Sequence, residues 1–521
     1  MRAAIGIDIG TSSSKGVLVG LDGTIVARAD RQHEVSRPHP GHVEMDAATW
    51  WDDFVAIARD LVRAANAATG TTTGPTHAAP TDPATGPATA ARSDVSIAAV
   101  GVSGMGPCTL LTDAAGTPVR PAILYGIDTR ATEQIARLTA ELGADAIIAR
   151  CNAPLTSQAV GPKLAWVADH EPEAFAHARR LFMPSSWLAW KLTGAYVLDH
   201  CSASQAWPLY DATANGWYEP WARRICPEIE LPELAWADDV VGTVSVGAAA
   251  ETGLPAGIPV IAGTIDAWAE AVSAGSHGAG DTMVMYGTTM AALATAAEPF
   301  SSSTHWPTVG ALPGTYTLVC GMATSGAITA WLRELFGSPG YPELLALAET
   351  SGPGARGLLM LPYFAGERTP LQDPDARGVI AGLTLSHTRG DLYRAALEAT
   401  AFGLRHNLEL MRASGSRIER VVAVGGGTQG SLWTRIVSDV TGLSQVIPTQ
   451  RTGASLGSAF LAARTVSDVD IDTWNPPATV CRPNPDLAAG YDEAYAAYRS
   501  LYPATREIAH RLAETQRHAA S

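Results

Sequence analysis

At 521 residues the chain is too long for one hydrophobic core, and its length fits two large domains or three smaller ones. With 46% hydrophobic and 17% charged residues it has a globular composition, and no apolar run reaches the roughly 18 residues that span a bilayer. The formal charge of −15, without clusters of Lys and Arg, argues against nucleic-acid binding. Residues 1–4 lead into a strand pattern rather than a signal peptide, so we expect a soluble cytoplasmic protein.

The first hundred residues predict a β-meander, a helix and a buried strand. Apolar runs on both sides of Asp22-Gly23 are typical of an antiparallel hairpin. Apolar residues at helical spacing predict a helix over 47–65, and a continuous apolar run predicts a strand over 95–102. Residues 66–93 contain almost no large apolar side chains, so we expect a flexible surface insertion that adds nothing to the core.

The rest of the chain repeats this order of elements. Helical patterns mixed with tryptophan-rich loops occupy 130–234, and the Pro/Gly-rich stretch 253–259 is typical of a crossing into a second half. Two α/β halves suggest a duplication around an interdomain cleft, with domains at 1–252 and 253–521. The elements expected in the second half are strands at 260–262 and 421–424, helices at 266–274, 325–336, 390–412 and 432–440, and a hairpin around Gly287.

Two short turns of glycine and hydroxyl residues lie between apolar strand-like runs, at 10–14 and 287–289. A strand that breaks at glycine exposes backbone amides and hydroxyls, which together bind an oxyanion. Two such turns in one chain suggest one nucleotide that is held from two sides.

Two charged residues accompany the first turn. Asp8 belongs to an apolar run, and a buried carboxylate needs a compensating charge, which a hydrated magnesium ion in a phosphate site would provide. The alternative is an Asp that caps a tight turn. Lys15 either brings a cation to a transferred phosphoryl group or is a solvated lysine at a strand edge.

Asp266 follows a buried strand and begins a helix, the position at which α/β folds bind ligands. A carboxylate there can accept the proton of a hydroxyl that attacks phosphorus, or can simply stabilise the helix dipole. Gly425-Gly426-Gly427 joins a strand to a helix and permits close approach of a ligand, although it is neither a Walker loop nor a G-x-G-x-x-G fingerprint. The polar loop 366–378 by itself predicts no more than a salt-bridged connector.

Taken together, these segments resemble the FGGY family of carbohydrate kinases within the actin-like ATPase superfamily. Nine segments occur in the family's order over nearly the whole chain, which makes the resemblance specific. They are Gly6-Ile7-Asp8-Ile9-Gly10-Thr11-Ser12, Gly101-Val102-Ser103-Gly104-Met105, Pro121-Ala122-Ile123-Leu124-Tyr125, Asp128-Thr129-Arg130, Gly263-Thr264-Ile265-Asp266, Tyr286-Gly287-Thr288-Thr289, Gly366-Glu367-Arg368-Thr369-Pro370, Gly425-Gly426-Gly427 and Gly453-Ala454-Ser455-Leu456-Gly457-Ser458-Ala459.

The resemblance implies an α/β fold of two actin-like (ribonuclease H-like) domains, each a mixed sheet flanked by helices, that close over ATP and a sugar. It implies that Asp8 organises Mg²⁺ and that Asp266 is the catalytic base. Homodimers are common in this family. The resemblance further places Thr11, Ser12, Lys15, Gly287, Thr288 and Thr289 at the phosphates, Gly426, Gly427 and Gly430 beside the adenosine, and Met105, Gly106, Tyr125, Asp128, Arg130, Asp266 and Ala267 at the sugar.

The expected sugar site departs from other members of the family. Xylulokinase-like members carry Gln-Met-His-Gly, and glycerol kinases Asn-Gln-Arg-Glu, where this chain has Ser103-Gly104-Met105-Gly106. Ala267 follows the catalytic Asp where Asn or Gln is usual, and Tyr125-Gly126-Ile127 replaces the usual Trp-Asn. The usual sugar hydrogen bonds are therefore missing, although Tyr125 and Trp268 can still stack on a sugar face.

We therefore expect an ATP-dependent, magnesium-requiring kinase that phosphorylates a hydroxyl of a sugar, polyol or sugar acid. By resemblance, a pentulose or pentitol acceptor (xylulokinase-like) ranks first, ahead of gluconate-like acids and linear autoinducer sugars. Two alternatives stay open, an actin-like ATPase switch and a sugar-binding protein of little catalytic activity. No nucleic-acid or membrane partner is expected.

Overall fold

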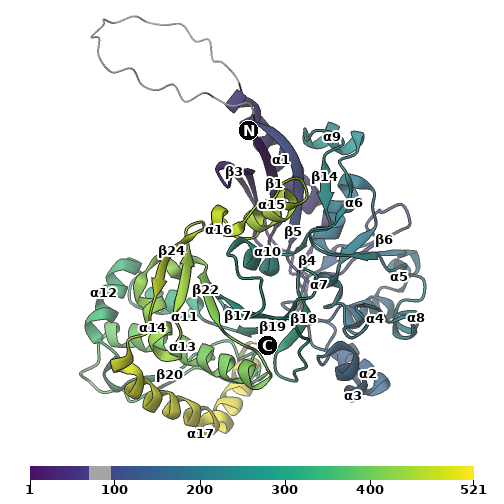
Figure 1. The fold of residues 1–521 in the computed structure, drawn as a ribbon. Coiled ribbons are helices and arrows are strands. Elements are labelled where there is room, and N and C mark those ends of the chain that lie inside the picture. Colours follow the sequence, from purple (N-terminus) through teal and green to yellow (C-terminus); the bar gives the residue numbers. More distant parts are fainter. Residues whose placement is uncertain (70–94, 521) are drawn as a thin grey trace, which may run out of the picture.

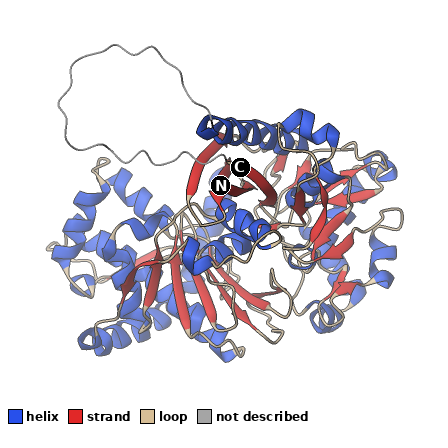
Figure 2. Cartoon of the chain, turned by 45° about the horizontal axis from the view of Figure 1, so that its top comes forward, coloured by secondary structure: helices blue, strands red, loops and turns tan. Residues whose placement is uncertain are grey.

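The computed structural model describes residues 1–69 and 95–520. Within this part of the chain, two seven-stranded mixed sheets are each flanked by helices (Figure 1). Figure 2 shows the two groups of strands with the helices arranged around them. The expected α/β class is confirmed. We call the sheet that contains the N-terminal strand, with the helices packed on it, the first unit, and the other seven-stranded sheet with its helices the second unit.

The first sheet is built on the central strand β1 (Arg2–Ile9). All of its residues after Arg2 are buried, because strands and helices cover both faces, and this explains the uninterrupted apolar run. β1 pairs antiparallel with β2 and parallel with β5, in a register that sets Asp8 opposite both Lys15 and Ser103. The other strands of this sheet are β2 (Ser13–Gly20), β3 (Ile25–Gln32), β5 (Ser96–Gly104), β13 (Val240–Thr243), β14 (Pro259–Ile261) and β15 (Thr264–Ile265).

Helix α1 (Ala47–Thr69) packs on this sheet and runs further than its apolar pattern predicts. The first four residues of the expected insertion, 66–69, continue the helix, and residues 70–94 lie outside the described residues. The helices that follow in the first half are α2 (Thr132–Leu142), α3 (Ala144–Cys151), α4 (Val160–His170), α5 (Pro172–His177), α6 (Pro184–Thr193), α7 (His200–Ala203), α8 (Glu219–Ile225) and α9 (Val246–Thr252).

The second sheet repeats the meander of the first. β16 (Asp281–Tyr286) and β17 (Met290–Ala296) form the predicted hairpin across Gly287, and β22 (Arg420–Val424) pairs parallel with β16 as β5 does with β1. The remaining strands are β18 (Trp306–Val309), β19 (Tyr316–Met322), β23 (Gln445–Pro448) and β24 (Pro477–Cys481). The helices of this half are α10 (Asp266–Ser273), α11 (Gly326–Leu335), α12 (Tyr341–Ser351), α13 (Arg389–Ala413), α14 (Ser431–Thr441), α15 (Ala454–Arg464), α16 (Ile471–Trp474) and α17 (Ala488–Ala520).

Helix α15 returns from the C-terminal half and packs on β1 and β5 of the first sheet, beside α10 (Figure 1). Glycines make this close approach possible: a Cβ on Gly6 would lie 2.0 Å from the Ser455 carbonyl oxygen, and one on Gly101 would lie 1.9 Å from that of Ser458. β14 and β15 also join the first sheet, so this unit extends past residue 252, the boundary expected from the Pro/Gly-rich stretch.

Short two-stranded sheets and helix α17 complete the molecule. α17 contributes Tyr491, Tyr495 and Tyr498 to the core that lies between the second sheet and α13. The short pairs are β4 (Glu44–Met45) with β7 (Ala122–Ile123), β6 (Leu110–Thr112) with β8 (Arg180–Phe182), β9 (Val197–Asp199) with β12 (Glu233–Ala235), β10 (Tyr210–Asp211) with β11 (Gly216–Trp217), and β20 (Leu359–Leu361) with β21 (Val379–Ala381).

Candidate active site

A cavity of about 530 Å³ lies between the two units and is lined by residues of both sheets. The end of β1, the start of α10 and the loops after β16 and β22 all open into it. Of the site residues predicted from the sequence, those that line this cavity are Asp8, Lys15, Gly106, Tyr125, Asp266, Ala267, Thr289 and Gly426.

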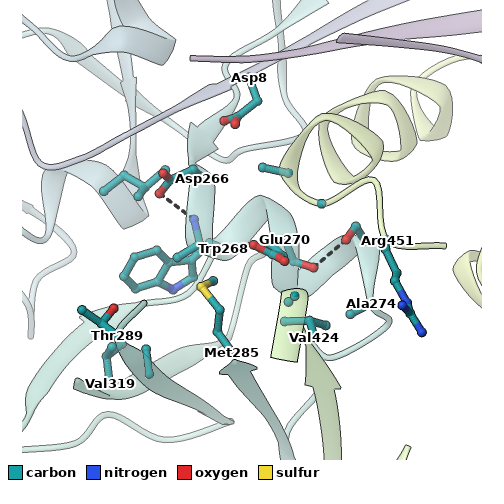
Figure 3. Close-up of a pocket in the computed structure, with 18 of the residues that line it drawn as sticks. Asp8, Asp266, Trp268, Glu270, Ala274, Met285, Thr289, Val319, Val424 and Arg451 are labelled. Carbon is teal, nitrogen blue, oxygen red and sulfur yellow. Dashed lines mark hydrogen bonds between the residues drawn. The ribbon is translucent and has the colours of Figure 1, made fainter. Parts of the chain in front are cut away.

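Asp8 reaches the cavity from the end of β1 (Figure 3). Its Oδ1 accepts a hydrogen bond of 2.8 Å from the Ser103 hydroxyl on β5. Burial raises the pKa of Asp8 well above its ordinary value, the charge of Asp266 raises it further, and the Ser103 hydrogen bond opposes both. Asp8 is therefore a buried carboxylate whose charge the protein alone compensates poorly.

Asp266 is the first residue of α10, and its Oδ1 accepts a hydrogen bond of 2.8 Å from the Ala267 amide. Burial also raises the pKa of Asp266. One helical turn further, burial and the charge of Asp266 raise the pKa of Glu270 to about 7, while Lys15 lowers it. Figure 3 shows the carboxylates of Asp8, Asp266 and Glu270 around the same space. This arrangement concentrates negative charge at the centre of the cavity.

Both predicted turns are present in the structure, but only some of their residues line the cavity. In the first turn, the Gly10 amide donates to the Ser13 carbonyl at 3.1 Å, and the Thr11 hydroxyl lies 3.0 Å from the Tyr125 hydroxyl. In the second turn, the Gly287 amide donates to the Thr289 carbonyl at 3.1 Å. Lys15 and Thr289 line the cavity itself, whereas Thr11, Ser12, Gly287 and Thr288 belong to the turns but do not line it.

The three consecutive glycines after β22 have different roles. Gly425 has a φ of +93°, and a Cβ there would lie 2.6 Å from the Tyr286 carbonyl oxygen. A Cβ on Gly427 would lie 2.7 Å from the Trp433 ring, so both glycines allow backbone packing. Gly426 lines the cavity, and among the described residues no atom would meet a Cβ there within 4 Å. Gly425 and Gly426 both line the cavity, and of the three glycines only Gly426 has open space at its Cβ among the described residues. A Cβ on Gly430 would meet Leu345 at 2.9 Å.

Three predicted sugar-site residues do not line the cavity. The side chains of Asp128 and Arg130 are fully buried and form an ion pair of 2.8 Å, and Arg130 also bonds Glu44 at 2.7 Å. Asp128 further accepts a hydrogen bond of 2.6 Å from the Val43 amide. Met105 is 1% exposed and packs in the core of the first unit. The structure therefore buries these three residues away from the cavity, where Asp128 and Arg130 pair with each other and Met105 packs in the core.

Several cavity residues were not singled out from the sequence as site residues. Glu270 could have been found, because it lies one helical turn after Asp266 and therefore on the same face of α10. Arg368 lies in the polar loop 366–378, which by itself predicted only a salt-bridged connector. Gly453 and Ala454 belong to the quoted segment 453–459, to which no site role was given. Other residues line the cavity without any local signal: Gln158, Gln205, Trp207, Trp306, Gln450, Arg451 and Thr452.

The carboxylates at the centre fit a Mg²⁺ ion, because Asp8 and Asp266 offer buried oxygen donors whose charges repel each other. In the described parts of the chain, no three His, Cys, Asp or Glu side chains gather as a complete metal cluster. A Mg²⁺ ion here would therefore complete its shell with water and phosphate oxygens, as it prefers to do.

Comparisons with known proteins support a kinase site. Residues 3–273 match the N-terminal domain of the FGGY family of carbohydrate kinases, and residues 282–466 match its C-terminal domain. The xylulose kinase of Escherichia coli K12 is 30% identical over 464 residues, 88% of each chain. The glycerol kinase of Nocardia farcinica is 30% identical over 493 residues, 89% of this chain and 90% of the relative.

A solved structure agrees over nearly the whole chain. The crystal structure of xylulose kinase from Rhodospirillum rubrum superposes with a TM-score of 0.86 at 32% identity, covering 98% of this chain and 100% of that one. Among the helices of the described residues, none has the length and apolar character needed to cross a membrane. On its sequence matches, its fold and its site, the chain belongs to the FGGY family of carbohydrate kinases.

Proposed function

We propose that this kinase transfers the γ-phosphoryl group of ATP, with Mg²⁺, to a primary hydroxyl of a five-carbon ketose such as xylulose. The observation that carries the proposal is the pair of buried carboxylates, Asp8 and Asp266, that face one cavity beside the two glycine turns. Relatives that are xylulose kinases support the choice of acceptor. We further place the enzyme in the cytoplasm, as a homodimer.

Asp266 is the proposed base. Its carboxylate takes the proton of the acceptor hydroxyl as that oxygen attacks the γ-phosphorus, while the bond between this phosphorus and the β,γ-bridging oxygen breaks and ADP leaves. Its position at the N-terminus of α10 is rigid, because the Ala267 amide fixes one carboxylate oxygen at 2.8 Å. A rigid base keeps the hydroxyl aligned with phosphorus, which lowers the entropic part of the barrier.

Asp8 would hold Mg²⁺ in this scheme. When bound, Mg²⁺ would supply positive charge that stabilises the negative charge building up on the transferred group. Ser103 keeps the Asp8 carboxylate oriented through its hydrogen bond of 2.8 Å. Lys15 and Thr289 approach the phosphates from opposite units, and Gly426 leaves the space for the adenosine end.

The test replaces the proposed base. Asp266→Asn keeps the size of the side chain but removes its basicity, so we expect xylulose-dependent ADP release to fall by at least about 10²-fold. ATP binding, followed by calorimetry with Mg²⁺, should stay within a few-fold of the wild type. Asp486→Asn, in the short 3-10 helix just before α17, is the control, because Asp486 is exposed and its replacement should not change turnover. Near-normal turnover of Asp266→Asn would show that another group is the base.

A further inference from the structure

The first turn, residues 10–14, is held from outside the cavity by two largely buried side chains, His33 and Asp53. His33 follows directly after β3, and Asp53 lies in α1, which packs on β2 and β3. The His33 Nδ1 lies 2.8 Å from the Asp53 Oδ2, and the two side chains are 7% and 15% exposed. Neither residue lines the cavity, and the proposed reaction uses neither.

Both residues bond the turn directly. The His33 Nε2 lies 3.0 Å from the Gly10 carbonyl oxygen, and the His33 backbone amide donates to the Ser12 carbonyl at 3.1 Å. The Ser14 hydroxyl donates to the Asp53 Oδ2 at 2.7 Å. The beginning, the middle and the end of the turn are therefore each fixed by a residue from another element.

These contacts require a definite placement of hydrogen atoms. A carbonyl oxygen can only accept, so the His33 Nε2 carries the proton of its bond to Gly10. An ionised Asp53 can also only accept, and its Oδ2 receives both the Ser14 hydroxyl and the His33 Nδ1. With Asp53 ionised, His33 satisfies both acceptors only as an imidazolium. A bond between an imidazolium and a carboxylate is stronger than a neutral one, so the pair is a firm anchor for the turn.

The anchored turn joins two side chains that line the cavity. Asp8 near the end of β1 and Lys15 in β2 are partners in the register of the two strands. Gly10 is two residues from Asp8, and Ser14 is next to Lys15. A shift of either anchored residue would therefore change how Asp8 and Lys15 stand relative to each other.

We propose that His33 and Asp53 are positioning residues for phosphoryl transfer, which hold the first turn and Lys15 in the geometry that binds the phosphates of ATP. We call this pair the turn clamp. The inference rests on the proposed function and deepens it, because the clamp acts through the turn and Lys15. Its loss should weaken the binding of ATP and leave the binding of the sugar nearly unchanged.

A second pair between the same two elements provides a matched control. Asp60 lies seven residues after Asp53, about two helical turns, and so on the same face of α1. Arg31 lies two residues before His33, and its Nη2 is 2.6 Å from the Asp60 Oδ2. This pair also joins the strand to α1, but among the described residues its side chains form no hydrogen bond to the turn.

The test makes one change at each pair. Asp53→Asn removes the charge of the clamp, and Asp60→Asn removes the charge of the control. We expect the calorimetric Kd of ATP with Mg²⁺ to rise by at least about fivefold in Asp53→Asn and by less than about twofold in Asp60→Asn. The KM for xylulose should stay within about twofold in both. Equal losses of ATP affinity would mean that the clamp only stabilises the first unit, and would overturn the proposal.

Substitutions of His33 separate its two side-chain contacts. His33→Phe keeps a ring but removes both, so it should weaken ATP binding as much as Asp53→Asn does. His33→Gln brings an amide NH₂ to the place of Nε2, where it can donate to Gly10, whereas the shorter side chain of His33→Asn reaches only Asp53. We therefore expect His33→Gln to recover more ATP affinity than His33→Asn. Equal affinities of all three variants would overturn the role of the Gly10 contact.

Failure of the clamp can be distinguished from failure of the proposed function. If no sugar releases ADP, the proposed function is wrong, and ATP binding without an acceptor still decides for the clamp. Urea unfolding shows whether the two Asp→Asn variants are equally stable, and if Asp53→Asn does not fold, the comparison of His33→Gln with His33→Asn decides. Wild-type affinity for ATP in both Asp53→Asn and His33→Phe overturns the clamp.

Discussion

At the scale of single residues, the site depends on carboxylates that burial makes difficult to ionise. Asp8, Asp266 and Glu270 lie around one space, and burial is the largest cause of the raised pKa in each. A phosphoryl-transfer site needs such charges to hold a metal and to accept a proton. The folded enzyme therefore retains an electrostatic penalty at neutral pH that its ligands relieve.

The pH dependence of catalysis follows from Asp266. Burial raises the pKa of Asp266 to about 6, so the base is protonated and inactive below that pH. We expect kcat/KM for xylulose to fall about tenfold per pH unit below about pH 6, because the enzyme that binds xylulose then loses its ionised base. The pH profile of kcat/KM is measured from initial rates with xylulose between pH 5 and 8, at saturating Mg²⁺ and ATP. A profile flat down to pH 5 would contradict this assignment.

Stability should respond to pH in the opposite direction. Between the ordinary value of 3.8 and the raised pKa of about 6, the folded protein holds a proton on Asp266 that the unfolded chain has released. The unfolded state therefore binds fewer protons, and the free energy of unfolding falls as pH rises through this window. In Asp266→Asn the side chain at this position does not titrate, so its free energy of unfolding should not fall in this way as pH rises.

We therefore expect the melting temperature of Asp266→Asn, relative to the wild type, to increase from pH 5 to pH 8 by about 1 °C. Scanning calorimetry at the two pH values measures the difference. Asp486→Asn should show no such change. A difference that is constant, or that shrinks at pH 8, would mean that Asp266 is not an ionised, buried group in the free enzyme.

Bound Mg²⁺ should relieve part of the electrostatic repulsion between the buried carboxylates of Asp8 and Asp266. Because Asp8 and Asp266 repel each other, we expect ATP with Mg²⁺ to raise the melting temperature more than ATP with EDTA. In Asp8→Asn the two conditions should differ less, since one proposed oxygen donor is gone. An equal response to both conditions in the wild type would argue against a metal between these carboxylates and the phosphates.

At the scale of elements, glycines decide how closely helices approach the first sheet. Gly6 and Gly101 lie on neighbouring strands beneath α15, and Gly457 on α15 faces α10. A Cβ on Gly457 would lie 1.8 Å from the Ala269 carbonyl oxygen, so α15 is held against both β1 and the helix that begins at Asp266. The packing of α15 therefore fixes the position of the proposed base.

Gly101→Ala tests this contact. The added Cβ would lie 1.9 Å from the Ser458 carbonyl oxygen, a backbone atom that cannot rotate away. We expect loss of soluble protein, or a destabilisation of at least about 3 kcal/mol, measured by urea unfolding. Gly247→Ala in α9 has open space at its Cβ among the described residues and should be neutral or slightly stabilising. Similar behaviour of the two variants would contradict the packing argument.

At the scale of the whole molecule, the C-terminal helix is part of the second unit although the family match ends at residue 466. Tyr491, Tyr495 and Tyr498 of α17 enter its core, and the Tyr498 hydroxyl lies 2.8 Å from that of Tyr363. α17 also binds the acceptor-side loop, because Tyr502 and His510 both bond Asp373, at 2.6 and 2.7 Å. The helix therefore links the core to the loop that carries Arg368.

A chain that stops after residue 466 should be insoluble. It would lose the edge strand β24 and the three buried tyrosines of α17, which exposes the apolar face that they cover. Expression followed by fractionation and size-exclusion chromatography measures the outcome. A chain that stops after residue 517 is the control and should remain folded and active. A soluble, monodisperse protein ending at 466 would contradict this view of α17.

Local sequence signals predicted much of the fold. The meander of β1, β2 and β3, the hairpin across Gly287 and the helix that begins at Asp266 follow from apolar periodicity and glycine turns, which act over a few residues. The same signals predicted Asp8, Lys15 and Thr289 as site residues, and all three line one cavity in the structure. The helix that runs into residues 66–69 shows that neighbouring turns can extend a helix through residues with little apolar character.

Which side chains surround the proposed acceptor depends on the tertiary structure and could not be predicted from local sequence. Asp128 and Arg130, expected at the sugar, pair with each other, and Glu44, distant in sequence, also pairs with Arg130, so the folded chain buries both residues away from the cavity. The side chains that line the proposed acceptor side come from separate segments of both units, and no local pattern joins them: Gln158, Gln205, Trp207, Trp306 and Arg368. The sequence by itself therefore determined the kinase family, the fold and the carboxylates, whose motifs are contiguous. Only the tertiary structure decided what surrounds the acceptor, because a wall built from distant segments exists only after the chain has packed.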